Sequence, residues 1–154
     1  MYTLKPMDHA FCEAEKAFSE GEVPVGATII GVSTGNLIAT SHNEMIQRSD
    51  PTAHAELLVI QKACQILGLS RLEDCDIYVT LEPCPMCAQA ISFARFRRLY
   101  FGAYDPKGGG VDHGDQIFQA SSCHHKPEVI GGMNEAKCAQ LLIQFFQKVR
   151  GTSS

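Results

Sequence analysis

Hydrophobic residues recur with two different periods along the chain, and these periods predict its secondary structure. Met7, Ala10, Ala14 and Phe18 recur three or four positions apart, which predicts an amphipathic helix over residues 7–20. The continuous apolar run at residues 25–31 is typical of a buried strand, and the turn-forming residues 33–36 lead into the next strand. The same reasoning predicts further strands at 37–41, 77–81, 99–102 and 128–130, and further helices at 53–67, 85–96 and 134–150.

Strands and helices therefore alternate around one expected sheet. We expect Thr52 to cap the helix at 53–67 and Pro85 to occupy the first turn of the next helix, where its missing N–H has no partner to lose. A long glycine-rich loop should cover residues 103–127, with one helical turn near 116–120. These elements predict an α/β protein: a single domain over residues 1–154, with three α/β/α layers around a five-stranded mixed sheet.

Composition and charge narrow the possible classes of protein. The chain has 154 residues, of which 45% are hydrophobic and 19% charged, and no apolar run is long enough to cross a bilayer. Its seven cysteines are scattered and odd in number, which does not suggest a disulfide framework, so we expect a reducing cytoplasm. The net charge of −4 disfavours a protein that holds long nucleic acid by its phosphates, but it leaves a local RNA contact possible.

Two short motifs carry the candidate chemistry. His54 and Glu56 stand two positions apart at the start of one predicted helix, and Cys84 and Cys87 stand three apart at the start of the next. One imidazole and two thiolates are zinc ligands, and a catalytic zinc site leaves its fourth position to water. Glu56 is then the carboxylate that can move the proton of this water. The pattern H-x-E with P-C-x-x-C is the signature of zinc-dependent nucleobase deaminases.

Two other interpretations of these motifs remain open at this point. Cys123, His124 or His125 could reach the metal through the fold and close the site, which would make the protein a non-catalytic zinc module. Cys84 and Cys87 could also form a thioredoxin-like redox pair, although His54 and Glu56 would then have no explanation. The 30 residues that separate His54 from Cys84 leave room for one helix and one strand, which would return both motifs to one sheet edge.

Four segments extend the pattern beyond the zinc motifs: residues 23–27, 50–56, 78–87 and 101–103. Together they resemble the bacterial tRNA-specific adenosine deaminases, within the cytidine and deoxycytidylate deaminase superfamily, and the similarity runs from about residue 10 to residue 150. The resemblance implies a cytidine-deaminase-like fold, one Zn²⁺ per chain held by His54, Cys84 and Cys87, and Glu56 as proton shuttle. It also implies a homodimer that forms inosine at the wobble adenosine of a tRNA anticodon stem-loop, in an arginine tRNA.

The resemblance also assigns substrate contacts. Asn43 matches a residue that hydrogen-bonds the flipped base, and Asp105 and Lys107 match a loop that touches neighbouring nucleotides. Phe145 and Phe146 should help to close the RNA groove, with one of them in the core. The alternative on the same fold is a free nucleobase or nucleoside deaminase acting on guanine or cytosine, which the acidic net charge favours.

Overall fold

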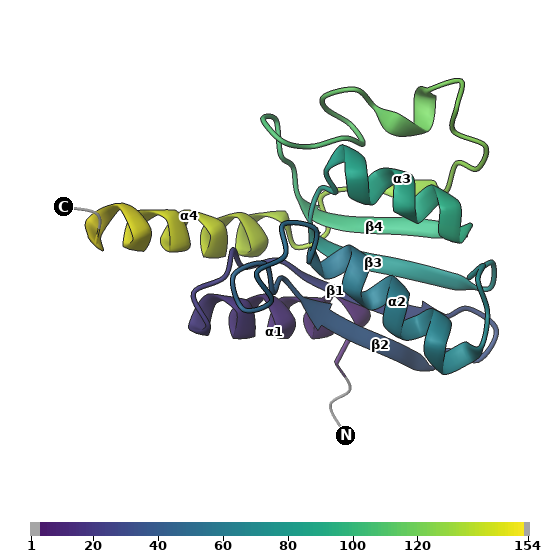
Figure 1. Cartoon of the computed structure of the whole chain (residues 1–154), viewed down its shortest axis with the longest axis horizontal. Helices are drawn as coiled ribbons and strands as arrows, with labels where there is room; N and C mark the ends of the chain where they lie inside the picture. Colours follow the sequence, from purple (N-terminus) through teal and green to yellow (C-terminus); the bar gives the residue numbers. More distant parts are fainter. Residues whose placement is uncertain (1–3, 153–154) are drawn as a thin grey trace.

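The computed structural model describes residues 4–152 and is built around a five-stranded sheet in the order β2-β1-β3-β4-β5 (Figure 1). Strand β1 pairs antiparallel with both β2 and β3, whereas β3, β4 and β5 are parallel. The sheet is therefore mixed, as predicted. The strands are β1 Gly26–Gly31, β2 Leu37–His42, β3 Cys75–Leu81, β4 Arg98–Ala103 and β5 Glu128–Ile130.

Helices cover both faces of this sheet. The helices are α1 Pro6–Ser19, α2 Ala55–Leu67, α3 Pro85–Ala94 and α4 Glu135–Thr152, with a 3₁₀ turn η1 at Ile117–Gln119. On one face, α1 packs against β1 and β2, and α4 packs against β4. On the other face, α2 and α3 lie side by side (Figure 1). This arrangement confirms the predicted three-layer α/β/α class.

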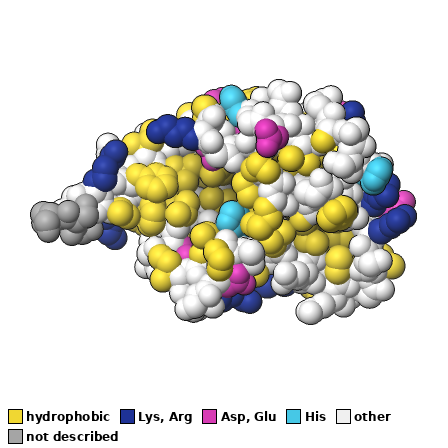
Figure 2. All heavy atoms as spheres, turned by 45° about the horizontal axis from the view of Figure 1, so that its top comes forward, with side chains coloured by type: hydrophobic (Ala, Val, Ile, Leu, Met, Phe, Trp, Pro, Cys, Tyr) yellow, Lys and Arg dark blue, Asp and Glu magenta, His cyan; other side chains and the backbone are white. Residues whose placement is uncertain are grey.

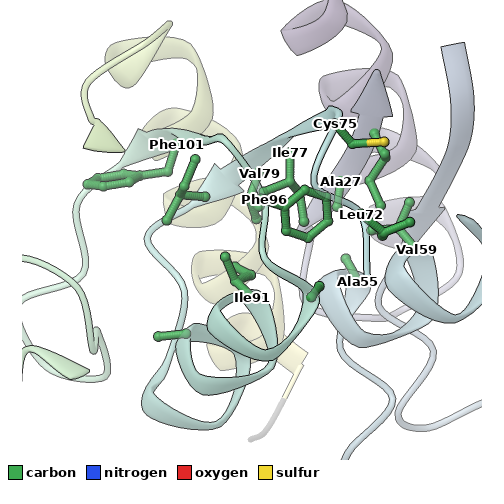
Figure 3. Close-up of a cluster of buried hydrophobic side chains, with 14 of the residues drawn as sticks. Ala27, Ala55, Val59, Leu72, Cys75, Ile77, Val79, Ile91, Phe96 and Phe101 are labelled. Carbon is green, nitrogen blue, oxygen red and sulfur yellow. The ribbon is translucent and has the colours of Figure 1, made fainter. Parts of the chain in front are cut away.

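The main core fills the space between the sheet and the α2–α3 layer. Figure 3 shows Ile77 and Val79 of β3 close to Phe96, with Ile91 of α3 and Val59 of α2 in the same cluster. All five of these side chains have no solvent-exposed surface. This core fixes the beginnings of α2 and α3 relative to the ends of the central strands, which is where the candidate site lies.

One glycine is required by the close approach of α1 to the sheet. A Cβ atom on Gly26, the first residue of β1, would overlap the carbonyl oxygen of Ala10 and lie 2.7 Å from the amide nitrogen of Ala14. Both atoms belong to the backbone of α1 and cannot rotate away. The helix therefore rests directly on the strand at this point.

The predicted elements are all present, and the bounds of the helices and strands differ from the prediction by at most two residues. Two of the differences, both at helix ends, have a clear local cause. We predicted that Thr52 caps α2, but the helix begins two residues later and His54 occupies the N-cap position. The Thr52 hydroxyl instead donates to Asp50 within a local turn. Helix α3 ends at Ala94, two residues before the prediction, because Arg95 adopts a left-handed conformation with φ +65°. Within residues 4–152, no helix has the length and apolar character that a membrane span needs.

Candidate active site and metal centre

Three predicted zinc ligands meet at the beginnings of α2 and α3. His54 is the N-cap residue of α2, Cys84 is the N-cap residue of α3, and Cys87 lies in the first turn of α3. The Nδ1 atom of His54 lies 3.7 Å from Sγ of Cys84 and 3.5 Å from Sγ of Cys87. The candidate ligand atoms of all three residues lie within 4.8 Å of one another. Nδ1 is thus the nitrogen that faces the two sulfurs.

The spacing of these atoms fits a tetrahedral zinc ion. A sulfur at about 2.3 Å and a nitrogen at about 2.05 Å from zinc lie about 3.6 Å apart at the tetrahedral angle. A hydrogen bond from Cys87 lowers the pKa of Cys84 to about 4, and the same contact raises the pKa of Cys87. The contact thus favours the thiolate form of Cys84, and a divalent cation would hold both sulfurs as thiolates.

Glu56 lies beside the ligands without joining their cluster. It is the second residue of α2, its side chain is 4% exposed, and it lines a pocket of about 240 Å³ together with His54 and Cys84. Burial raises the pKa of Glu56 to about 7, because the charged form loses its hydration. A carboxylate in this place can exchange protons with a molecule bound between it and the metal ligands.

Asn43 forms another part of the same pocket. It directly follows β2 and is 5% exposed, and its Oδ1 accepts the N–H of Ala55 at 2.8 Å. This bond satisfies one of the N–H groups that a helix leaves free in its first turn. Because the oxygen is used in this way, the NH₂ group of Asn43 is the part that can donate to a ligand in the pocket.

Two buried carboxylates hold the loops that form the pocket walls, and neither was singled out from the sequence. Glu22 accepts the N–H groups of Ile46, at 3.1 Å, and Gln47, at 2.8 Å, in the loop that follows Asn43. Glu82 accepts hydrogen bonds from the loop at residues 105–113. Burial alone would raise the pKa of Glu82, but the hydrogen bonds from this loop outweigh it and lower the pKa. No sequence signal marks either contact, since the partners are 23 to 31 positions apart.

A groove of about 610 Å³ runs from this pocket along α4. The pocket and the groove share Val23, Leu81 and Asp105 among their lining residues, and Lys107 and Phe146 line the groove further out. Figure 2 shows that the surface is hollowed between hydrophobic side chains in the middle of this face. Asp105 therefore lines both the pocket and the groove, and Lys107 lines the groove. Their contacts with substrate, which the family resemblance implied, stay a prediction.

The two late phenylalanines separate as expected. Phe145 is 7% exposed and packs edge-to-face against Phe18 of α1, with ring centroids 5.8 Å apart. Phe146 is 47% exposed and faces the groove. One aromatic ring thus belongs to the core and the other is open to a ligand.

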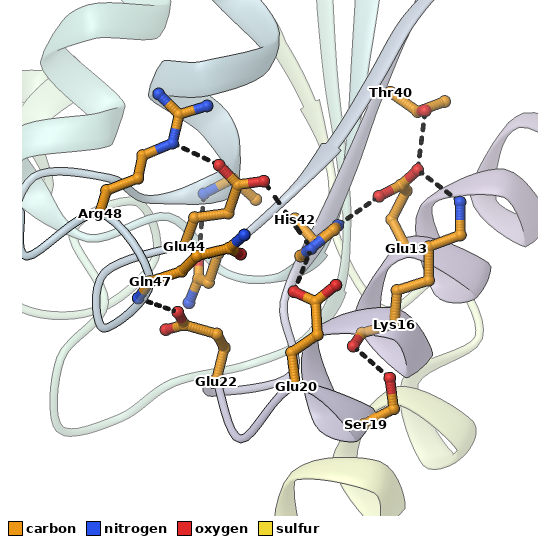
Figure 4. A network of polar contacts seen from close by, with 12 residues as sticks. Glu13, Lys16, Ser19, Glu20, Glu22, Thr40, His42, Glu44, Gln47 and Arg48 are labelled. Atoms are coloured by element: carbon orange, nitrogen blue, oxygen red, sulfur yellow. Dashed lines mark hydrogen bonds and ion pairs between the residues drawn. The ribbon is translucent and has the colours of Figure 1, made fainter.

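A network of charged side chains stabilises the end of the strand that precedes Asn43 (Figure 4). His42 binds Glu13 through Nδ1 at 2.6 Å and Glu20 through Nε2 at 2.9 Å, and Glu44 lies 3.9 Å from Nε2. Burial alone would lower the pKa of His42, but the hydrogen bonds to Glu13 and Glu20 outweigh it and raise the pKa. The network joins α1 to the end of β2 next to the pocket.

Of the residues proposed as a fourth ligand, Cys123 and His125 are engaged elsewhere and His124 is exposed at the surface. The Cys123 thiol and the His125 carbonyl both contact the Ser92 hydroxyl in α3, at 3.3 and 2.7 Å, and the His125 ring bonds the carbonyl of Phe96 at 2.7 Å. Among residues 4–152, the His54, Cys84 and Cys87 group is the one ligand cluster found. The described part of the chain thus leaves the fourth coordination position free, as a catalytic site requires.

Comparisons with known proteins agree with this geometry. Residues 3–103 match the model of the cytidine and deoxycytidylate deaminase zinc-binding region. A tRNA-specific adenosine deaminase of Agrobacterium fabrum is 51% identical over 144 residues, which are 94% of this chain and 93% of the relative. A solved structure from work on A-to-I editing by tRNA:A34 deaminases superposes with a TM-score of 0.85 at 50% identity, over 88% of this chain and 97% of the other.

A guanine deaminase from Nitrosomonas europaea has the same fold, with a TM-score of 0.79 over 91% of this chain and 82% of the other. Its identity of 19% makes it a relative in fold alone. The redox interpretation of the two cysteines is wrong, because the fold and the family model are those of zinc-dependent deaminases.

Proposed function

Because the chain belongs to the tRNA-specific adenosine deaminases of the cytidine and deoxycytidylate deaminase family, we propose that it converts the wobble adenosine of a tRNA anticodon, in an arginine tRNA, into inosine. The observation that carries this proposal is the likeness to a tRNA-specific enzyme over nearly the whole chain. The reaction consumes one water and releases one ammonia, and an oxygen replaces the amino group of the base. The free cysteines suit a reducing cytoplasm.

In the chemical step, Glu56 moves the protons. When bound, one zinc ion supplies the positive charge that makes a water acidic enough to lose a proton near neutral pH. His54, Cys84 and Cys87 hold this ion between two helix N-termini. Glu56 takes one proton of the attacking water and passes it to the ring nitrogen of the base. It then carries the second proton of this water to the amino group, which departs as ammonia and leaves the oxygen on the base as a carbonyl. Its burial keeps bulk water away from these transfers.

Recognition of the base and of its neighbours uses the pocket and the groove. The NH₂ group of Asn43 donates to the flipped base. Asp105 and Lys107 contact the flanking nucleotides, and the exposed ring of Phe146 offers a face on which an unstacked base can lie. A contact confined to a few nucleotides of an anticodon loop needs no basic protein, which reconciles RNA binding with a net charge of −4.

The same proposal includes a homodimer that uses the α2–α3 layer. Two strongly exposed hydrophobic residues belong to this layer: Phe93 in α3, 68% exposed, and Ile66 in α2, 63% exposed. Replacing Phe93 with aspartate should shift the protein from dimer to monomer in sedimentation velocity. The same change at Ile143 of α4, in the opposite layer, should leave the dimer intact. A wild-type monomer would refute the homodimer.

The decisive experiment measures inosine formation in an arginine anticodon stem-loop RNA, with free adenosine, guanine and cytosine as alternative substrates. We expect conversion of the wobble adenosine alone. Conversion of a free base without conversion of the RNA would replace this proposal with a free-base deaminase, which is the activity named for the Nitrosomonas europaea relative.

A substitution at Glu56 tests the mechanism. Glu56→Gln keeps the size of the side chain but cannot accept and return the proton, so turnover should fall by about 10²–10⁴-fold. Zinc content and melting temperature should stay close to those of the wild type, because the ligands are unchanged. Wild-type turnover in this variant would exclude Glu56 as the proton shuttle.

A further inference from the structure

Glu82 lies between the end of β3 and the zinc motif, and its side chain has no solvent-exposed surface. Its Oε1 accepts the N–H of Asp105 at 3.1 Å and Nδ1 of His113 at 2.8 Å. Its Oε2 accepts the N–H groups of Val111 at 3.2 Å, Asp112 at 3.0 Å and His113 at 3.0 Å. One buried carboxylate thus holds both ends of the loop at residues 105–113.

The loop is also packed tightly against the strand end that leads into the zinc motif. A Cβ atom on Gly109 would overlap the carboxylate of Glu82, and one on Gly110 would lie 2.6 Å from the nitrogen of Pro85. The N–H of Gly110 donates to the carbonyl of Pro83 at 2.8 Å. The path of the loop is therefore set by direct contact with Glu82 and with the first residue of α3.

This loop forms a wall of the pocket and of the groove. Asp105 and Gly108 line the pocket that holds His54 and Glu56, and Asp105 and Lys107 line the groove. The Asp105 side chain closes its own turn by accepting the N–H of Gly108 at 3.0 Å. Glu82, by contrast, directs both carboxylate oxygens to the loop.

We propose that Glu82 is a positioning residue that fixes the loop at residues 105–113 as the wall of the substrate site, and so sets the affinity for RNA around the target base. This inference rests on the proposed function, since RNA is the ligand whose flanking nucleotides reach the groove. Glu82 has no part in the proton transfers, which Glu56 carries out. Loosening the loop should therefore weaken RNA binding more than it slows the chemical step.

Replacement with glutamine affects the two ends of the loop differently. All five contacts to Glu82 come from donors, whereas a glutamine has only one oxygen. The single oxygen of the glutamine keeps the most hydrogen bonds in the orientation in which it faces the backbone N–H groups of Val111, Asp112 and His113. The amide NH₂ then faces the N–H of Asp105, and this hydrogen bond is lost. Glu82→Gln should thus free the Asp105 end, and Glu82→Ala should free both ends.

A matched control lies on the same strand. Asp76, near the beginning of β3, is 5% exposed and accepts two hydrogen bonds from Arg97, at 3.1 and 2.7 Å. Asp76→Asn also replaces a buried carboxylate that accepts several hydrogen bonds, but it lies far from the pocket. It should lower the melting temperature without changing the loop or the kinetics.

The test combines amide hydrogen exchange, zinc content and steady-state kinetics on the zinc-loaded wild type, Glu82→Gln and Asp76→Asn. Loss of a hydrogen bond to a charged group corresponds to about tenfold or more in an equilibrium constant. In Glu82→Gln we expect exchange at Asp105 to be about tenfold faster and KM for the stem-loop RNA about tenfold higher. We expect kcat within about threefold of the wild type and an unchanged zinc content.

Unchanged exchange in the loop, or a lower kcat with an unchanged KM, would overturn the proposal. A similar KM change in Asp76→Asn would do the same, because it would assign the effect to general destabilisation. A wild-type protein that does not deaminate the RNA would instead refute the proposed function. Loop exchange in Glu82→Gln and Glu82→Ala needs no substrate, so it separates the two failures.

Discussion

Replacing His42 with glutamine should destabilise the protein at mildly acidic pH and much less at alkaline pH. A neutral imidazole has one N–H, yet both ring nitrogens of His42 face carboxylates, those of Glu13 and Glu20. The protonated ring satisfies both. Glutamine retains a polar group of similar length but cannot carry the charge.

The size of the effect follows from the burial of each partner. His42 and Glu13 expose 12% and 11% of their side chains, and a hydrogen bond to a charged group in such a place contributes about 1.5–3 kcal/mol. Glu20 exposes 43% of its side chain, and an ion pair this open contributes less than about 1 kcal/mol. His42→Gln should therefore cost about 2–3 kcal/mol at acidic pH, which lowers the melting temperature by roughly 5–10 °C in a chain of this length.

The direction of the pH dependence is fixed by the two pKa shifts. The pKa of His42 is raised, so its contribution is complete below the unfolded-state pKa of about 6.5 and disappears as the pH rises through the folded-state value. Burial alone would raise the pKa of Glu13, but hydrogen bonds from His42 and Thr40 lower it. Its contribution is complete above the unfolded-state pKa of about 4.5 and is lost only at more acidic pH. The pair is therefore strongest between about pH 4.5 and pH 6.5.

Thermal unfolding of zinc-saturated protein at about pH 6 and at about pH 9, on the two sides of this titration, measures the effect. The difference in melting temperature between wild type and His42→Gln should be larger at the lower pH. His124 is exposed, so His124→Gln is the matched control and should show little difference at either pH. A His42→Gln penalty that stays constant or grows with pH would refute the assignment of a charged His42.

Two further predictions concern the site. Chelation of zinc should lower the melting temperature, and added zinc should restore it. When free zinc is 1,000 times its Kd, the bound ion should add about 4 kcal/mol to the free energy of unfolding. An unchanged melting temperature would exclude the metal centre. Asn43→Asp keeps the acceptor for the N–H of Ala55 but lacks the NH₂ donors, so it should fold normally and lose deamination. Asn43→Ala should in addition lower the free energy of unfolding by about 1–3 kcal/mol, which thermal unfolding measures. Wild-type activity in either variant would exclude Asn43 from base recognition.

The sequence was informative where local pattern decides structure. Hydrophobic periodicity predicted every strand and helix, since apolar positions repeat within each element. The spacing of His54, Cys84 and Cys87 predicted that they would meet, because one helix and one strand fit between the two motifs and return the second motif to the same edge of the sheet. The start of α2 was misplaced because a local turn between Asp50 and Thr52 competes with the helix for the threonine hydroxyl.

What the sequence did not reveal are contacts between segments that are distant along the chain. Glu22 and Glu82 resemble surface carboxylates in the sequence, and the structure buries both against loop N–H groups. The charged network likewise joins His42 to two carboxylates that lie 29 and 22 positions earlier in the chain. Such contacts depend on how the layers pack, and neither hydrophobic periodicity nor a sequence motif predicts them.

The way in which Glu82 holds its loop has a consequence for how the protein can diverge. Four of its five hydrogen bonds come from main-chain N–H groups, which every residue except proline possesses. Side chains at positions such as Lys107 and Asp112 can therefore be exchanged while the loop keeps its course, although Gly109 and Gly110 cannot accept a Cβ without displacement. If this loop contacts the flanking nucleotides as proposed, substitutions in it can change the preference for those bases while the metal centre next to it stays as it is.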